Sequence, residues 1–157
     1  MNEQLSFLND TKNILLSLRE EYYNDMLSGK KHYEYRTRFL KEKTTAYIYI
    51  SKTKKKIVAK IEFGIPIIGT ATEIARIAEN DEPGCFDDMI SYFYNDIGYA
   101  IPIEKIIPIE EISLEELKSL FSDFVVPQSY YILDKKKKLL EFLQSRESIE
   151  NEIYRRR

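Results

Sequence analysis

The succession of patterns over residues 14–39 constrains the fold more than any other feature of the sequence. Residues 14–18 form a short apolar run that predicts a buried strand, and residues 19–28 predict a helix that ends at Gly29. Residues 32–39 then alternate between two sets of side chains, which is the pattern of a strand. Glu34 and Arg36 belong to the set that forms a polar face. We therefore expect a strand, a helix and a second strand with one polar face that carries charged side chains.

Further strands and helices follow without regular alternation. Composition and spacing predict strands at 45–51, 56–63, 99–103, 105–109 and 130–133, and helices at 72–80, 86–94 and 114–121. Pro102 and Pro108 disfavour central positions in a sheet. A terminal helix is expected from an N-cap at Asp134 to about Tyr154. This order predicts an α+β protein, a small β-barrel of five to seven strands with helices at its periphery, rather than a doubly wound sheet.

Length and composition limit the classes of protein further. The 157 residues, 43% hydrophobic and 32% charged, fit one domain with a buried core. One histidine (His32) and one cysteine (Cys85) cannot supply a zinc site of the Cys₂His₂ or His₃ type, so metal catalysis is not expected except through carboxylates. No metal site and no cofactor is predicted. The single cysteine excludes a disulfide framework and fits a reducing compartment. Because no secretory signal and no bilayer-spanning apolar stretch is visible, we expect a cytoplasmic protein with no membrane partner.

The formal net charge of −2 conceals a segregation of charges along the chain. Residues 30–60 contain eleven basic and two acidic side chains, whereas residues 61–134 contain three basic and fifteen acidic ones. Residues 135–157 are basic again, with eight basic and four acidic side chains. The pattern fits either a local basic patch that binds phosphate or mutual pairing of the oppositely charged segments in the fold.

The spacing of four residues between positions 29 and 36 resembles that of a known family. After the expected strand and helix, Gly29, Lys31, Glu34 and Arg36 fit the pattern Gly-x-Lys-x-x-(Glu/Thr)-x-Arg. This pattern resembles the signature of the ASCH family, a branch of the PUA-like superfold. Residues 126–133 (VPQSYYIL) are similar to the Pro-Gln-Ser segment before the final barrel strand of related proteins. The resemblance implies an ASCH/PUA-like domain at 1–134, and a basic helix at 135–157 that packs on it or extends from it.

The resemblance also implies a cleft that binds RNA or a nucleotide and that, in one branch of the family, hydrolyses the acyl group of N4-acetylcytidine. Lysine and arginine suit phosphate, and a carboxylate accepts from the exocyclic amine of cytosine. We predict a ligand site centred on Lys31, Glu34 and Arg36. Further candidates are Arg38, Tyr49, Gln128, Ser129 and the hairpin lysines, which are Lys52, Lys54, Lys55 and Lys56. If the protein is an enzyme, Lys31 and Glu34 are the candidate catalytic residues.

Three functions remain open at this point. The first, placed ahead of the others, is a protein that binds RNA or a modified nucleoside or nucleotide, and the second is a hydrolase acting on a modified base or on RNA. The hydrolase reading meets an obstacle, because the resemblance places Glu34 where the deacetylating branch has a threonine nucleophile. The third is a non-catalytic regulator that binds a protein through the apolar residues of the terminal helix, Leu139, Leu143, Ile149 and Ile153. The alternative to a ligand site is that Glu34 and Arg36 form an ion pair that only stabilises the barrel, and the sequence fits this interpretation equally well.

Overall fold

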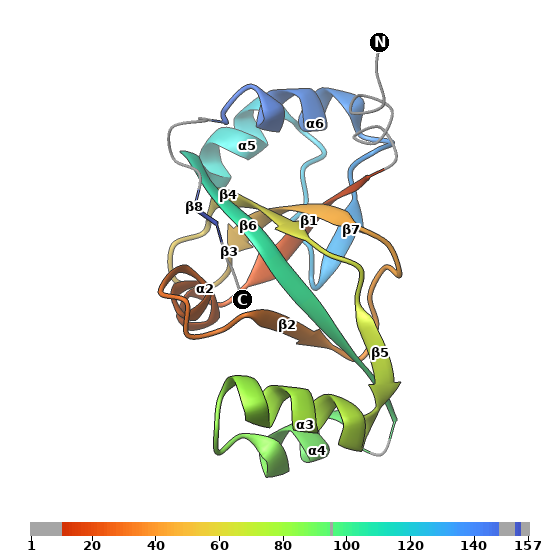
Figure 1. Ribbon diagram of the computed structural model, residues 1–157. Coiled ribbons are helices and arrows are strands. Elements are labelled where there is room, and N and C mark those ends of the chain that lie inside the picture. The colour runs from red at the N-terminus through yellow and green to blue at the C-terminus, as the bar shows by residue number, and fades with distance from the viewer. Residues whose placement is uncertain (1–10, 95, 148–152, 155–157) are drawn as a thin grey trace.

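The computed structural model describes residues 11–94, 96–147 and 153–154 (Figure 1). The described elements, in chain order, are β1 (Lys12–Leu18), α2 (Glu20–Leu27), β2 (Tyr33–Arg36), β3 (Thr44–Ile50), β4 (Lys56–Phe63), β5 (Ile67–Thr70), α3 (Ala71–Asp81), α4 (Phe86–Phe93), β6 (Ile97–Ser113), α5 (Leu114–Leu120), β7 (Tyr130–Ile132), α6 (Lys137–Gln144) and β8 (Ile153–Tyr154). Strands and helices do not alternate regularly, and the predicted α+β class is confirmed.

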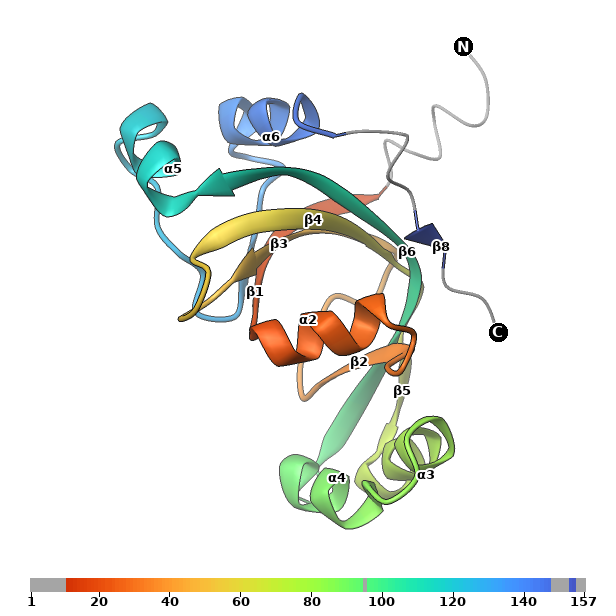
Figure 2. The same cartoon turned by 90° about the vertical axis from the view of Figure 1, so that its left-hand side faces the viewer.

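The strands form one curled sheet in the order β2-β6-β4-β3-β1-β7, and β5 and β8 both pair with β6. All pairs are antiparallel except β1 with β3, whose crossover contains α2 and β2. Figure 2 shows the sheet curling around α2, with α5 and α6 outside the curl and the α3–α4 pair at its far end. The predicted small barrel with peripheral helices is therefore a curled half-barrel.

Alternation along the central strands supplies two apolar cores. On β1, Ile14 and Leu16 face the core inside the curl, whereas Leu15 faces the core under α5 and α6, and all three are fully buried. Complete burial of each such side chain contributes about 1.5–3 kcal/mol. The central strands of the curled sheet are thus buried on both faces.

The two strands predicted at 99–103 and 105–109 are one strand, β6, of 17 residues. Proline was expected to keep these segments from the centre of the sheet, and that expectation is wrong. Pro102 pairs with Tyr33 at the last position of the β2–β6 ladder, and Pro108 pairs with Ala59 beside a register shift in β4. Both prolines lie where the regular ladder is interrupted, so their missing N–H groups are tolerated.

The C-terminal helix is shorter than predicted. Helix α6 ends at Gln144, and Ile153–Tyr154 forms β8, which pairs with β6. Asp134 does not cap α6, because its carboxylate accepts hydrogen bonds from the backbone N–H and the side-chain amide of Asn13. Leu139 and Leu143 pack into the core of this same chain, while Ile149 lies outside the described residues. The apolar face proposed for a protein partner is therefore occupied where it is described.

Among the residues that the structure describes, no helix is both long and apolar enough to cross a membrane.

Candidate functional site

The end of α2 delivers Lys31 to the inside of the fold. Gly29 has a φ of +84°, and its N–H donates to the carbonyl of Met26, while the N–H of Lys31 donates to the carbonyl of Asp25. A left-handed conformation of this kind is easily adopted by glycine. The chain therefore reverses within three residues, and Lys31 lies between α2 and β2.

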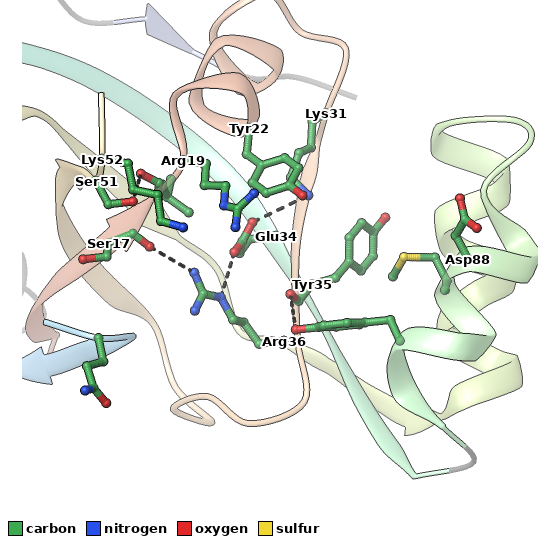
Figure 3. Close-up of a pocket in the computed structure, with 14 residues that line it drawn as sticks. Ser17, Arg19, Tyr22, Lys31, Glu34, Tyr35, Arg36, Ser51, Lys52 and Asp88 are labelled. Atoms are coloured by element: carbon green, nitrogen blue, oxygen red, sulfur yellow. Dashed lines mark hydrogen bonds and ion pairs between the residues drawn. The ribbon is translucent and has the colours of Figure 1, made fainter. Parts of the chain in front are cut away.

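A cavity of about 570 Å³ lies at this junction. Its walls come from α2, β2, the end of β1, the β3–β4 turn, α4 and the segment before β7. The lining residues are Ser17, Leu18, Arg19, Tyr22, Lys31, Glu34, Tyr35, Arg36, Ser51, Lys52, Asp88, Met89, Tyr92 and Gln128. Figure 3 shows the charged side chains of this set converging from several elements.

Glu34 is the buried centre of the cavity's charged groups, with only 6% of its surface exposed. Its Oε1 lies 3.6 Å from Lys31 Nζ, and its Oε2 accepts from Arg36 Nε at 2.7 Å. Figure 3 shows the two cations on either side of the carboxylate. Each oxygen of Glu34 is thus engaged by a different cation, and this fixes the position of both.

Arg36 also joins two parts of the sheet. Its Nη1 donates to Ser129 Oγ at 3.0 Å, and its Nη2 donates to the carbonyl of Ser17 at 3.4 Å. The guanidinium therefore links β2 to the end of β1 and to the start of β7. The reading of Glu34 and Arg36 as a structural ion pair agrees with these contacts, and the same contacts place both side chains at the cavity.

Three tyrosines contribute aromatic surface. Lys31 Nζ lies 4.8 Å from the ring centroid of Tyr35 and 6.0 Å from that of Tyr22. The hydroxyl of Tyr92 donates to the carbonyl of Tyr35 at 3.5 Å. Burial raises the pKa of Tyr35, with a further contribution from Asp81, so this phenol stays protonated. The hydroxyl of Tyr35 is buried and has no hydrogen-bond partner among the described residues.

Helix α4 forms the far wall of the cavity, and α3 packs against it. Helix α3 begins with a capping box of Thr70 and Glu73, and it is tied to the start of β2 by His32. His32 Nδ1 lies 2.6 Å from Asp81 Oδ1, and the His32 N–H donates to Asp81 Oδ2 at 3.0 Å. Helix α4 then presents Asp88, Met89 and Tyr92 to the cavity. The only histidine of the chain therefore holds this wall in place and does not line the cavity.

The cavity carries an excess of positive charge. Four cations line it (Arg19, Lys31, Arg36 and Lys52), against the two carboxylates of Glu34 and Asp88. Arg19 and Lys52 are exposed, and neither forms an ion pair within the part of the chain that the structure describes. Two cations fixed by Glu34 and two with no carboxylate partner make a local site for an anion.

The structure brings several sequence-predicted residues to one place. Lys31, Glu34, Arg36, Lys52 and Gln128 all line the cavity, and the exposed Ser129 lies at its edge through its bond to Arg36. Arg19, Tyr22, Tyr35 and Tyr92 were not among the predicted site residues. The sequence contains no signal for Tyr92, because nothing in residues 72–96 shows that α4 packs back toward β2.

Other predicted residues lie elsewhere. Arg38 is exposed beyond the end of β2, which stops at Arg36 rather than at Phe39. Lys54 lines a separate cavity of about 260 Å³, and Lys55 is exposed in the turn. Lys56 Nζ lies 3.3 Å from Glu111 Oε1, so the basic and acidic segments do pair at this point. Only one of the hairpin lysines, Lys52, lines the main cavity.

The prediction that Tyr49 contacts a ligand in the cleft is wrong. Tyr49 is 2% exposed and packs with Ile57, Leu117 and Leu139 under the outer helices. Successive residues of β3 face opposite sides of the sheet, and Ile48 and Ile50 occupy the side inside the curl. Tyr49 therefore faces away from the cavity.

These features define a class: an α+β protein with a curled half-barrel sheet and a cationic cavity at the strand ends. No family model and no curated protein sequence matches the chain. Among solved structures, the chain is similar to ASCH from Zymomonas mobilis, with a TM-score of 0.73, 24% identity, and coverage of 88% of this chain and 98% of that one.

Two variants of the Zymomonas mobilis protein match equally well. A Tyr-to-Phe variant has a TM-score of 0.72 at 23% identity and covers 87% of this chain and 99% of that chain. A Ser-to-Ala variant has a TM-score of 0.70 at 23% identity and covers 88% and 99%. The chain therefore has the ASCH fold, which confirms the fold predicted from Gly29, Lys31, Glu34 and Arg36.

Proposed function

We propose that this protein binds RNA or a modified nucleotide in the cavity between α2, β2 and α4. The observation that carries the proposal is the combination of four cations and three tyrosines around one buried carboxylate. The volume of about 570 Å³ lies within the range of about 300–1,000 Å³ typical of ligand sites. RNA is recognised largely through phosphates and through bases stacked on aromatic rings, and both kinds of group are present here.

The roles of the side chains follow from their contacts. Arg19 and Lys52 have no carboxylate partner among the described residues, so they are assigned to phosphate. Tyr22 is 47% exposed and offers a ring face to a base. Glu34 holds Lys31 and Arg36 in place, since both of its oxygens are engaged by these cations.

The geometry favours binding over hydrolysis. A general base must accept a proton from water, and each oxygen of Glu34 already faces a cation. The side chain at this position also has no hydroxyl that an acyl group could esterify. The protein-binding alternative is not favoured, because Leu139 and Leu143 are buried in the chain's own core.

The test is a fluorescence anisotropy titration of a labelled single-stranded RNA decanucleotide. The test variant is Arg19→Gln/Lys52→Gln, and the control is Arg76→Gln/Lys118→Gln, which removes two exposed cations that do not line the cavity. A salt slope of about −0.7 per contact corresponds to about fivefold in affinity per contact between 1 M and 0.1 M salt.

We expect the test variant to bind about 25-fold more weakly than the wild type at 0.1 M salt, as two lost contacts require. The control variant should keep the affinity of the wild type within about threefold, because neither of its cations lines the cavity. Equal affinities of the two variants, or no RNA binding by the wild type at micromolar concentrations, would contradict the proposal.

A further inference from the structure

A second basic surface lies at the start of α6. Four consecutive lysines at positions 135–138, here called the lysine run, are all exposed. None of them forms an ion pair with any other residue that the structure describes. Lys136 Nζ lies over the ring of Tyr131, 5.4 Å from its centroid.

The position of the lysine run does not stabilise the helix. Lys137 and Lys138 occupy the first turn of α6, where the helix dipole disfavours cations, and this turn contains no acidic residue. Four positive charges close together also repel each other. Neither helix stability nor internal pairing therefore accounts for four lysines here, whereas an external anion would relieve both unfavourable effects.

The lysine run borders a concave surface with aromatic walls. Together with Phe121, Asp123, Phe124, Tyr131 and Leu139, the lysines line a cavity of about 370 Å³. Asp123 is the single carboxylate of this set against four lysines. The combination of excess positive charge and aromatic surface resembles that of the main cavity.

Strand β7 connects the two cavities. It begins directly after Gln128 and Ser129 at the main cavity and ends shortly before the lysine run (Figure 1). It lies at the end of the sheet order and, among the strands that the structure describes, pairs with β1 alone, so its other edge has no described strand partner. The six residue-to-residue steps from Ser129 to Lys135 span at most about 20 Å. At about 3.4 Å per stacked nucleotide, this is about six nucleotides.

We propose that the lysine run is a second phosphate-binding site for a single-stranded RNA that also occupies the main cavity, so that the ligand is a polymer rather than a free nucleoside. This inference rests on the proposed function of the main cavity. The RNA runs along the edge of β7 that has no described strand partner, with one end among Arg19 and Lys52 and its more distant phosphates at the lysine run.

The experiment compares RNA lengths. A labelled trinucleotide and a labelled decanucleotide are titrated with the wild type, with Lys137→Gln/Lys138→Gln, and with the control Arg76→Gln/Lys118→Gln. For two lost contacts the lysine-run variant should bind the decanucleotide about 25-fold more weakly at 0.1 M salt, and its salt slope should be smaller by about 1.4. Its affinity for the trinucleotide should equal that of the wild type. Its thermal midpoint should not fall, because the two charges are unfavourable in the fold.

The outcomes separate the two proposals. Unchanged decanucleotide affinity in the lysine-run variant overturns the second site and leaves the first intact. Equal losses for both lengths also overturn it, because the lysine run would then be the whole binding site. If Arg19→Gln/Lys52→Gln affects neither length, the function proposed for the main cavity fails instead.

A membrane surface is the other source of clustered phosphate. Sedimentation with phosphatidylserine vesicles, using the same variants, distinguishes it from RNA. If the lysine-run variant loses vesicle binding while its decanucleotide affinity is unchanged, the lysine run serves a membrane and the proposal is wrong. We expect no vesicle binding that depends on these lysines.

Discussion

Removing the charge of Glu34 measures how far the cavity depends on one buried carboxylate. The variant Glu34→Gln keeps the size of the side chain and leaves Lys31 and Arg36, whose side chains are 11% and 17% exposed, without a counter-charge. Removing one partner of a fully buried ion pair costs about 3–5 kcal/mol. Because this cavity is open to water and both cations keep some exposure, we discount the cost to about 2 kcal/mol.

The assay is thermal unfolding, followed by circular dichroism and repeated in urea. In a chain of this length a loss of 1 kcal/mol lowers the melting temperature by about 2–4 °C, so Glu34→Gln should melt about 4–8 °C below the wild type. The matched control is Glu111→Gln, which breaks the ion pair with Lys56. Those two side chains are 47% and 43% exposed, and the change should cost less than about 0.5 kcal/mol. A Glu34→Gln protein as stable as Glu111→Gln would refute the reasoning.

Four further predictions concern the same region and its surroundings. Gly29→Ala should destabilise the protein by about 1 kcal/mol in urea, since its Cβ meets nothing within 4 Å and only the left-handed backbone opposes it. Chromatography of reaction products should show little or no hydrolysis of N4-acetylcytidine by the wild type, and turnover that survives Glu34→Gln would mean that the reacting group lies elsewhere. Replacing all the hairpin lysines with serine should reduce the salt slope of RNA binding by only about 0.7, because Lys52 alone lines the cavity, and a reduction near 2.8 would contradict this placement. Burial, and to a smaller extent the charge of Asp123, raises the pKa of Tyr131 to about 12. The contribution of this phenol to the free energy of unfolding is therefore complete below about pH 10 and is lost as the pH rises toward 12. In urea unfolding, the stability of Tyr131→Phe should fall less steeply with alkaline pH than that of the wild type.

The sequence predicted the parts of the site that depend on local geometry. A strand has a side-chain period of two, so the spacing of Glu34 and Arg36 was sufficient to place both on one face. Gly29 likewise marked the end of α2 and the reversal that positions Lys31. Such inferences need only a few neighbouring residues and no knowledge of the tertiary fold.

The parts that failed depend on contacts between distant segments. Tyr49 was expected in the cleft, but which face of β3 is turned toward the cavity depends on the direction in which the whole sheet curls. Asp134 is of a residue type that favours the N-cap position, yet its carboxylate accepts a hydrogen bond from Asn13 on β1. Pro102 disfavours a central position in the sheet, yet β6 continues through it between β2 and β4. In each case a long-range contact overrides a local preference.

Strand β6 has a consequence for the cooperativity of unfolding. It pairs with β2, β4, β5 and β8, so the strands beside the α3–α4 wall and those beneath α5 share a single backbone. Opening either half would leave unpaired N–H and C=O groups along the same strand. Amide protons throughout β6 should therefore exchange with solvent only through global unfolding, at one common free energy. The α3–α4 pair packs on β6 through a buried cluster of Ala71, Ile74, Phe93 and Ala100, so we expect it to unfold together with the sheet rather than to open as an independent lid.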